Sequence, residues 1–216
     1  MEESSSSDHL NSSLTDLMTS LMVIFILLLL VFVQRTGAKD TAEATMLLAE
    51  LERQLKPGAP EIRQEQNRIL LIAPERLMSF ESGRYALSNE GKAFLQEKLP
   101  AIAGILYAKR FRDGIESIVV EGHSDLQAFQ GLPADESRNA NLELSQQRAM
   151  EVVKTALEDL KTTAQEEQDW FVAKLSSSGR GQQDCQAVDV QDECRKVIFV
   201  IRVRATDAET IKAKMK

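Results

Sequence analysis

The stretch KVIFVIRVR, Lys196–Arg204, decides the fold of this chain, because its apolar residues alternate as in a β-strand. Shorter runs of the same kind stand at Ile69–Ile72 and at Ile115–Glu121 (IESIVVE). Apolar residues at helical spacing mark two further segments, Asn89–Ala108 and Leu144–Leu160. Strand, helix, strand, helix and strand in this order predict an α/β (α+β) domain, with a mixed sheet and helices packed on one face.

A single long apolar run, Leu14–Val33 (LTDLMTSLMVIFILLLLVFV), stands near the N-terminus. As a helix it rises about 1.5 Å per residue, which is enough to cross a hydrocarbon core about 30 Å thick. No basic segment precedes it and no small-residue cleavage site follows it, so we expect an uncleaved transmembrane anchor. The chain after this run is polar and long enough for one domain and a linker.

One carboxylate, that of Asp16, lies at the start of the apolar run, and helix geometry places it on the same narrow face as Thr19 and Ser20. An acid inside a membrane costs at least a few kcal/mol, and it usually faces a partner or a path for ions. Asp is also a good cap for the first turn of a helix. On these residues alone, ion transport and helix capping are equally good interpretations.

Composition and charge exclude several classes of function. The formal net charge is −7 and no Lys/Arg-rich block is present, which argues against nucleic-acid binding. The sequence has no nucleophile–base pair, phosphate-binding loop or set of metal ligands, so we expect neither an enzyme nor a bound cofactor. Two positive charges after the apolar run, Arg35 and Lys39, weakly favour a cytoplasmic domain by the positive-inside tendency.

Both cysteines, Cys185 and Cys194, lie in one polar segment before the last predicted strand. We expect them to form a disulfide if the domain is outside the cytoplasm. Two idle thiols or half of a metal site are the alternatives, and neither a CxxC spacing nor a nearby histidine supports the metal.

The stretch Thr15–Met22 (TDLMTSLM) resembles the start of the membrane helix in B-type stator subunits, the MotB class of flagellar motor proteins. The resemblance implies that Asp16 binds and releases the driving ion, a proton or a sodium ion, beside the polar face of Thr19 and Ser20. It also implies a ring of multi-helix A-type subunits around a B-subunit dimer. The protein would then be a single-pass protein of the bacterial inner membrane, with a cytoplasmic N-terminus and a periplasmic domain.

Three further stretches resemble the OmpA-like peptidoglycan-binding domain. They are FESGRYAL (80–87) leading to Glu90-Gly91, VEGHSD (120–125) and NLELSQQRA (141–149). The resemblance spans about residues 69–205. It implies that the domain binds peptidoglycan and forms a homodimer. The sequence departs from the family in a longer loop between Asp125 and Asn141 and in a second extension, Lys161–Trp170.

The family match also implies a binding pocket for the zwitterionic amino-carboxylate of a diaminopimelate-type peptide stem. Asp125 would accept the ammonium group, and Arg148 would bind the carboxylate with its planar guanidinium. Asn141 and the backbone near Leu144 would complete the pocket, and a helix N-terminus at Leu144-Ser145 would favour the anion. The alternative is an ordinary salt bridge between Asp125 and Arg148.

These observations divide the chain into five regions: a cytoplasmic tail (1–13), the transmembrane helix (14–33), a linker (34–61), the OmpA-like domain (62–205) and a C-terminal tail (206–216). Within the linker, residues Ala42–Leu55 show helical spacing and end at a Pro-Gly pair. This segment is a linker or dimer helix or, by analogy with stators, a plug.

The short acidic tail and the inserted loops are most similar to the ZorB family, the B subunits of Zorya anti-phage defence motors. A flagellar or other motility stator is one alternative. A passive anchor between membrane and cell wall, in which Asp16 only caps the helix, is another.

Overall fold

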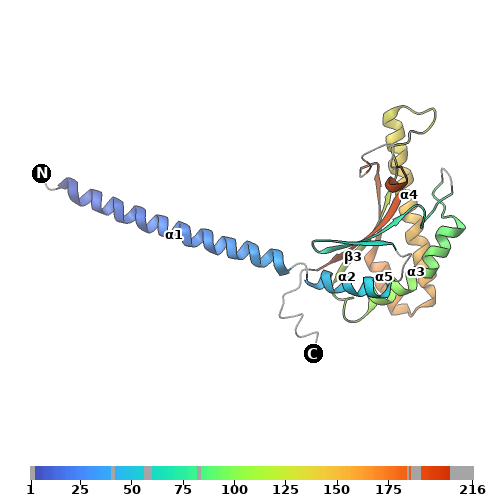
Figure 1. The fold of residues 1–216 in the computed structure, drawn as a ribbon, viewed down its shortest axis with the longest axis horizontal. Coiled ribbons are helices and arrows are strands. Elements are labelled where there is room, and N and C mark those ends of the chain that lie inside the picture. Colours follow the sequence, from blue (N-terminus) through green and yellow to red (C-terminus); the bar gives the residue numbers. More distant parts are fainter. Residues whose placement is uncertain are drawn as a thin grey trace.

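The computed structural model describes residues 3–39, 42–55, 60–81, 84–183, 185 and 191–204. A long N-terminal helix, α1 (Glu3–Lys39), extends away from a folded domain that begins at Ala42 (Figure 1). The domain consists of α2 (Ala42–Gln54), β1 (Glu61–Glu65), β2 (Arg68–Pro74), α3 (Asn89–Tyr107), β3 (Ile115–His123), α4 (Ala134–Asp159), the 3-10 helix η1 (Leu160–Thr162), α5 (Gln165–Lys174), β4 (Leu175–Gly181), α6 (Gln191–Cys194) and β5 (Lys196–Val203).

The five strands form one sheet in the order β1-β2-β5-β3-β4. β3 and β4 are parallel, and the other neighbouring strands are antiparallel. β5 lies in the centre, which suits its nearly continuous run of apolar residues. Its residues Val197, Ile201 and Val203 belong to the helix-covered core, whereas Ile198 and Val200 form a small apolar cluster on the opposite face. The predicted mixed sheet is confirmed.

Helices α2, α3, α4 and α5 cover one face of this sheet and enclose the main core, as predicted (Figure 1). Ser88 caps α3, and its Oγ accepts a hydrogen bond from the Gly91 amide at 3.0 Å. Each large apolar side chain in this core contributes about 1.5–3 kcal/mol through burial. The core includes the buried residues Leu47, Ile69, Leu99, Ile118, Ala156, Phe171 and Ile201.

Two glycines allow α4 to lie directly against the sheet. A Cβ atom on Gly122 would stand 2.2 Å from the Ser145 carbonyl oxygen, and one on Gly179 would stand 2.7 Å from the Gln146 amide nitrogen. Side chains of α4 then bond to β4, because the Gly181 amide donates to Ser145 Oγ at 2.9 Å and the Gly179 amide donates to Gln146 Oε1 at 2.5 Å. The position of α4 relative to the end of β3 is therefore fixed.

The second predicted helix begins earlier than expected. α4 starts at Ala134, and its first turns project beyond the sheet (Figure 1). Leu144 and Ser145 lie inside α4, where backbone amides bond to carbonyls of the preceding turn. The predicted helix N-terminus at these two residues, and with it a backbone contribution from Leu144 to anion binding, is therefore wrong. The second half of the predicted inserted loop, from Ala134, belongs to the helix.

Two strands, β1 and β4, and the short helices η1, α5 and α6 were not predicted. β1 is a charged edge strand and β4 (LSSSGRG) is rich in serine and glycine, so neither has a clear pattern of apolar alternation. The second predicted extension, Lys161–Trp170, contains the end of η1 and the beginning of α5.

α2 packs on the domain. Its apolar residues Ala44, Leu47 and Leu51 are almost completely buried, and they share a core cluster with Leu71 and Leu99. The apolar face of α2 is therefore already covered by the domain of the same chain.

α1 contains a stretch, Leu14–Phe32, that is long and apolar enough to cross a membrane. None of this stretch is buried inside the protein. The helical backbone continues upstream to Glu3, through most of the predicted tail.

Candidate functional site

The loop that follows β3 is held in place by the first turns of α4. Asp125 Oδ1 accepts a hydrogen bond from the Gln127 amide at 3.0 Å, which closes a tight turn. Asn141 Nδ2 donates to the Gln127 carbonyl at 3.0 Å, and Ser137 Oγ accepts from the Phe129 amide at 2.8 Å. These bonds fix the direction of the Asp125 carboxylate relative to α4.

A cavity of about 580 Å³ opens between this loop, α4 and the start of β5. All four residues that the sequence predicted for ligand binding line it. The lining residues are Glu75, Ser124, Asp125, Gln127, Ala128, Phe129, Gln130, Asn141, Leu144, Arg148 and Arg195.

Arg148 supplies a buried positive charge to the wall of this cavity. The residue is 8% exposed; its Nε donates to the Arg84 carbonyl at 3.2 Å, and its guanidinium lies 4.8 Å from the centre of the Phe80 ring. Among the described residues it forms no ion pair with a carboxylate. Burial lowers the pKa of the Arg148 guanidinium, although the nearby carboxylates of Glu75 and Asp125 act in the opposite direction.

The Asp125 carboxylate is paired with a different arginine from the one considered in the sequence. Its Oδ2 accepts a hydrogen bond from Arg195 Nη1 at 3.1 Å, and Arg195 Nε forms an ion pair with Glu75. The alternative expectation of a direct Asp125–Arg148 salt bridge is therefore not what the structure shows. Arg195 and Glu75 were not predicted as site residues, and nothing in their spacing places them opposite Asp125.

The other two predicted residues, Asn141 and Leu144, have different structural roles. Asn141 uses its amide nitrogen to brace the loop, and Leu144 contributes a wall of the cavity from inside α4. Ser124, which is 4% exposed, also lines the cavity. Its Oγ has no hydrogen-bond partner among the described residues.

The two cysteines form the predicted disulfide, with Cα atoms 5.1 Å apart. Cys194 is buried at the end of α6, and Arg195 follows it directly. The Arg195 carbonyl accepts a hydrogen bond from the Glu75 amide at 2.9 Å, and β5 begins at the next residue. The backbone of Arg195 is thus held by the disulfide on one side and by the sheet on the other.

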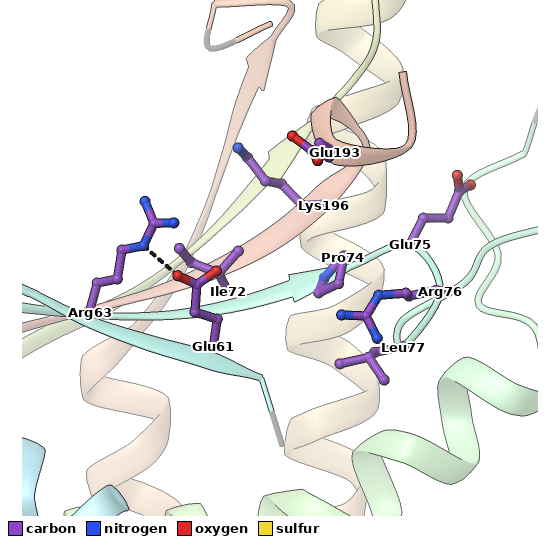
Figure 2. Close-up of a pocket in the computed structure, with 9 residues that line it drawn as sticks. All are labelled: Glu61, Arg63, Ile72, Pro74, Glu75, Arg76, Leu77, Glu193 and Lys196. Carbon is purple, nitrogen blue, oxygen red and sulfur yellow. Dashed lines mark hydrogen bonds and ion pairs between the residues drawn. The ribbon is translucent and has the colours of Figure 1, made fainter. Parts of the chain in front are cut away.

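A second cavity, of about 750 Å³, lies on the open side of the sheet near β1 and β2 (Figure 2). Its wall mixes acidic, basic and apolar side chains, and Arg63 forms an ion pair with Glu61 at 2.6 Å within it. Glu75 belongs to both cavities. The smaller cavity is the better candidate site because it contains the buried arginine.

Another charged cluster lies at the end of β3, on the open face. Glu121 Oε2 stands 3.7 Å from His123 Nε2 and 3.8 Å from Arg180 Nε. The His123 imidazole lowers the pKa of the Glu121 carboxyl; partial burial opposes this shift, and the Arg180 guanidinium supports it. This cluster stabilises the fold beside the candidate site without lining it.

The residues predicted for ion transport lie on α1, outside the domain. Asp16, Thr19 and Ser20 fall on one face of the helix, as their spacing requires. The Thr19 hydroxyl donates to the Thr15 and Asp16 carbonyls at 3.0 and 2.9 Å, so it is used locally. In the part of the chain that the structure describes, no group of His, Cys, Asp or Glu is placed to hold a metal ion.

No protein-family model and no curated protein matches this sequence. Solved structures do. A MotB-like protein from Desulfovibrio vulgaris aligns with a TM-score of 0.53 at 16% identity, over 79% of this chain and 98% of that one. The cell wall anchor of the T6SS from Pseudomonas aeruginosa (TM-score 0.49, 20% identity, 73% and 97% covered) and the periplasmic domain of Helicobacter pylori MotB (0.48, 18%, 71% and 94%) align less closely. The first alignment shows that the two proteins share a fold, the MotB-like arrangement that the sequence predicted.

Proposed function

We propose that the cavity beside Asp125 and Arg148 binds the zwitterionic amino-carboxylate of a diaminopimelate-type peptidoglycan stem. The observation that carries this proposal is the buried Arg148 guanidinium, which no carboxylate of the described protein pairs. A buried charge without a partner is costly, and a ligand carboxylate would compensate it with two parallel hydrogen bonds.

The surrounding groups suit the rest of such a ligand. Asp125 offers a fixed carboxylate for an ammonium group on the same cavity wall, and Ser124 offers a hydroxyl that no described residue bonds.

The test is co-sedimentation of the full-length protein, in detergent, with purified diaminopimelate-type peptidoglycan. Arg148→Ala removes the proposed carboxylate contact, and we expect affinity to fall roughly 10- to 100-fold, the value of a charge-assisted hydrogen bond. Arg138→Ala is the matched control, because Arg138 is an exposed arginine of α4 that does not line the cavity. Undiminished binding by Arg148→Ala would reject the pocket.

We further propose that the chain is the B subunit of an ion-driven rotary motor in the inner membrane. α1 would cross the membrane with its N-terminus in the cytoplasm, and the domain would hold the cell wall from the periplasm. The disulfide favours such an oxidising compartment. Asp16 would take up and release a proton or a sodium ion on the helix face that meets a ring of A-type subunits, around a dimer of this chain.

The substitution Asp16→Asn distinguishes a motor subunit from a passive anchor. The variant keeps the size and polarity of the side chain but cannot ionise, so we expect it to insert normally and to abolish motor-dependent activity. Asp8→Asn, the same change upstream of the apolar stretch Leu14–Phe32, serves as the control and should retain most of the activity. A fully active Asp16→Asn protein would reject ion transport by Asp16 and leave only the passive-anchor interpretation.

Among ion-driven motors, we propose the Zorya defence motor over a motility stator, because the acidic residues before Leu14 resemble those of the ZorB family. We expect cells carrying the protein with its neighbouring genes to resist phage infection, and to lose this resistance with Asp16→Asn. Restored swimming or gliding in a stator-deficient strain, without phage resistance, would favour the motility alternative.

A further inference from the structure

We propose that Arg195 is a built-in counter-ion of the pocket, which occupies Asp125 and which only a ligand with both an ammonium and a carboxylate group displaces. This inference rests on the proposed ligand class and assigns to Arg195 the role of a specificity-determining residue. It explains why Asp125, an acid on the cavity wall, would not bind every free cation.

The geometry places Arg195 between two acids. Its Nη1 donates to Asp125 Oδ2 at 3.1 Å, and its Nε pairs with Glu75. The Arg195 side chain is 30% exposed, whereas that of Asp125 is 8% exposed. One side of the Arg195 guanidinium therefore faces the cavity, and the Asp125 carboxylate lies behind it with the Gln127 amide on its other oxygen.

Displacement from Asp125 does not leave Arg195 without a partner, because Glu75 holds the same guanidinium. The movement needed is a side-chain rotation, since the disulfide at Cys194 and the start of β5 fix the backbone on either side. An incoming ammonium group exchanges one hydrogen bond for another at Asp125. The net gain from this exchange is small.

The balance of charges in the cavity makes this exchange selective for ligands that carry both an ammonium and a carboxylate group. Asp125 and Glu75 contribute two negative charges to the cavity wall, and Arg148 and Arg195 contribute two positive ones. A lone amine gains little at Asp125 because it must compete with Arg195. A ligand that also brings a carboxylate to Arg148 gains a second, uncontested ion pair, which offsets the cost of moving Arg195.

The test measures three simple ligands on the full-length protein in detergent by calorimetry. They are meso-diaminopimelate, which has both groups, cadaverine, which has only ammonium groups, and pimelate, which has only carboxylates. We expect Arg195→Ala to bind cadaverine roughly tenfold more tightly than wild type does, the value of one charge-assisted hydrogen bond. Pimelate binding should change by less than about threefold, because Arg148 is untouched.

Controls separate this role from others. Arg76→Ala removes a positive charge from the neighbouring cavity without exposing Asp125, so it should not raise cadaverine affinity. If Arg195→Ala unfolds, Arg195→Gln removes the charge and keeps a hydrogen-bond donor, and the same increase is expected. Unchanged cadaverine affinity, or a tenfold loss of pimelate binding, would overturn the inference.

The proposed function fails in a different way. If wild type does not bind meso-diaminopimelate, or if Arg148→Ala binds it as well as wild type, the ligand class is wrong. If meso-diaminopimelate binding depends on Arg148 but Arg195 has no effect on cadaverine, only the counter-ion role is refuted.

Discussion

Replacing Gly122 by alanine tests whether the contact between α4 and the sheet builds the binding pocket. The new Cβ would stand 2.2 Å from the backbone oxygen of Ser145, where an ordinary contact begins at 3.4 Å. The obstacle is backbone, so α4 must move outward by roughly 1 Å. Overpacking of this kind costs about 1–3 kcal/mol, which lowers the melting temperature by roughly 2–12 °C for a protein of this size.

The same shift should weaken ligand binding. Arg148 lies on α4 about one turn beyond Ser145, whereas Arg195 at the start of β5 holds the Asp125 carboxylate, so we expect the two groups to move apart. We expect the affinity for diaminopimelate-type peptidoglycan to fall by at least tenfold, because charge-assisted hydrogen bonds depend steeply on geometry. Co-sedimentation and thermal denaturation of the full-length protein measure the two effects.

Gly104→Ala is the matched control. This position lies within α3 and a Cβ there would meet no atom within 4 Å, so the substitution should stabilise the helix by about 0.5–1 kcal/mol and leave binding unchanged. A Gly122→Ala protein that melts and binds like wild type would refute the idea that close packing of α4 sets the pocket geometry.

Three further predictions concern the parts around the pocket. Leu47→Ala should destabilise the domain by about 2–5 kcal/mol in denaturant unfolding, because this side chain is 1% exposed in the core; a change below about 0.5 kcal/mol would show that α2 is a free linker. Replacing Cys185 and Cys194 by serine should cost about 2–3 kcal/mol, and a reducing agent should lower the stability of wild type but not of this variant; equal sensitivity would contradict a structural disulfide. Glu121→Gln should lower stability at pH 7 by about 1 kcal/mol, because the pKa of Glu121 is lowered in the folded protein. That contribution is present above the ordinary glutamate pKa of 4.5 and is lost as pH falls through the lower folded value, so the two proteins should converge in acid, and a constant difference across pH would contradict it.

Apolar periodicity predicted the elements that are held together by apolar contacts. β5 is central and nearly continuously apolar, and α3 begins at Asn89, directly after its N-cap residue Ser88. The first turns of α4 escaped prediction because Ser137 and Asn141, their buried residues, are polar and bond to the loop after β3. The spacing of apolar residues cannot predict such hydrogen bonds.

The candidate site was predictable only where it lies within short motifs. Asp125 and Arg148 stand in stretches that resemble a known domain, and the structure places both on one cavity. Arg195 is 70 positions from Asp125 in the sequence, and its direction depends on the disulfide and on β5. β4 has the composition of a turn, and it becomes a strand through pairing with β3 and through the contact of α4 at Gly179.

The most direct measurement of the central claim is titration of the full-length protein with two stem tripeptides, L-Ala-γ-D-Glu-meso-diaminopimelate and its L-lysine counterpart. The lysine side chain ends in an ammonium group without the adjacent carboxylate, so it cannot satisfy Arg148. We expect the diaminopimelate peptide to bind at least tenfold more tightly, and Arg148→Ala to remove this preference. Equal affinity of wild type for the two peptides would contradict it.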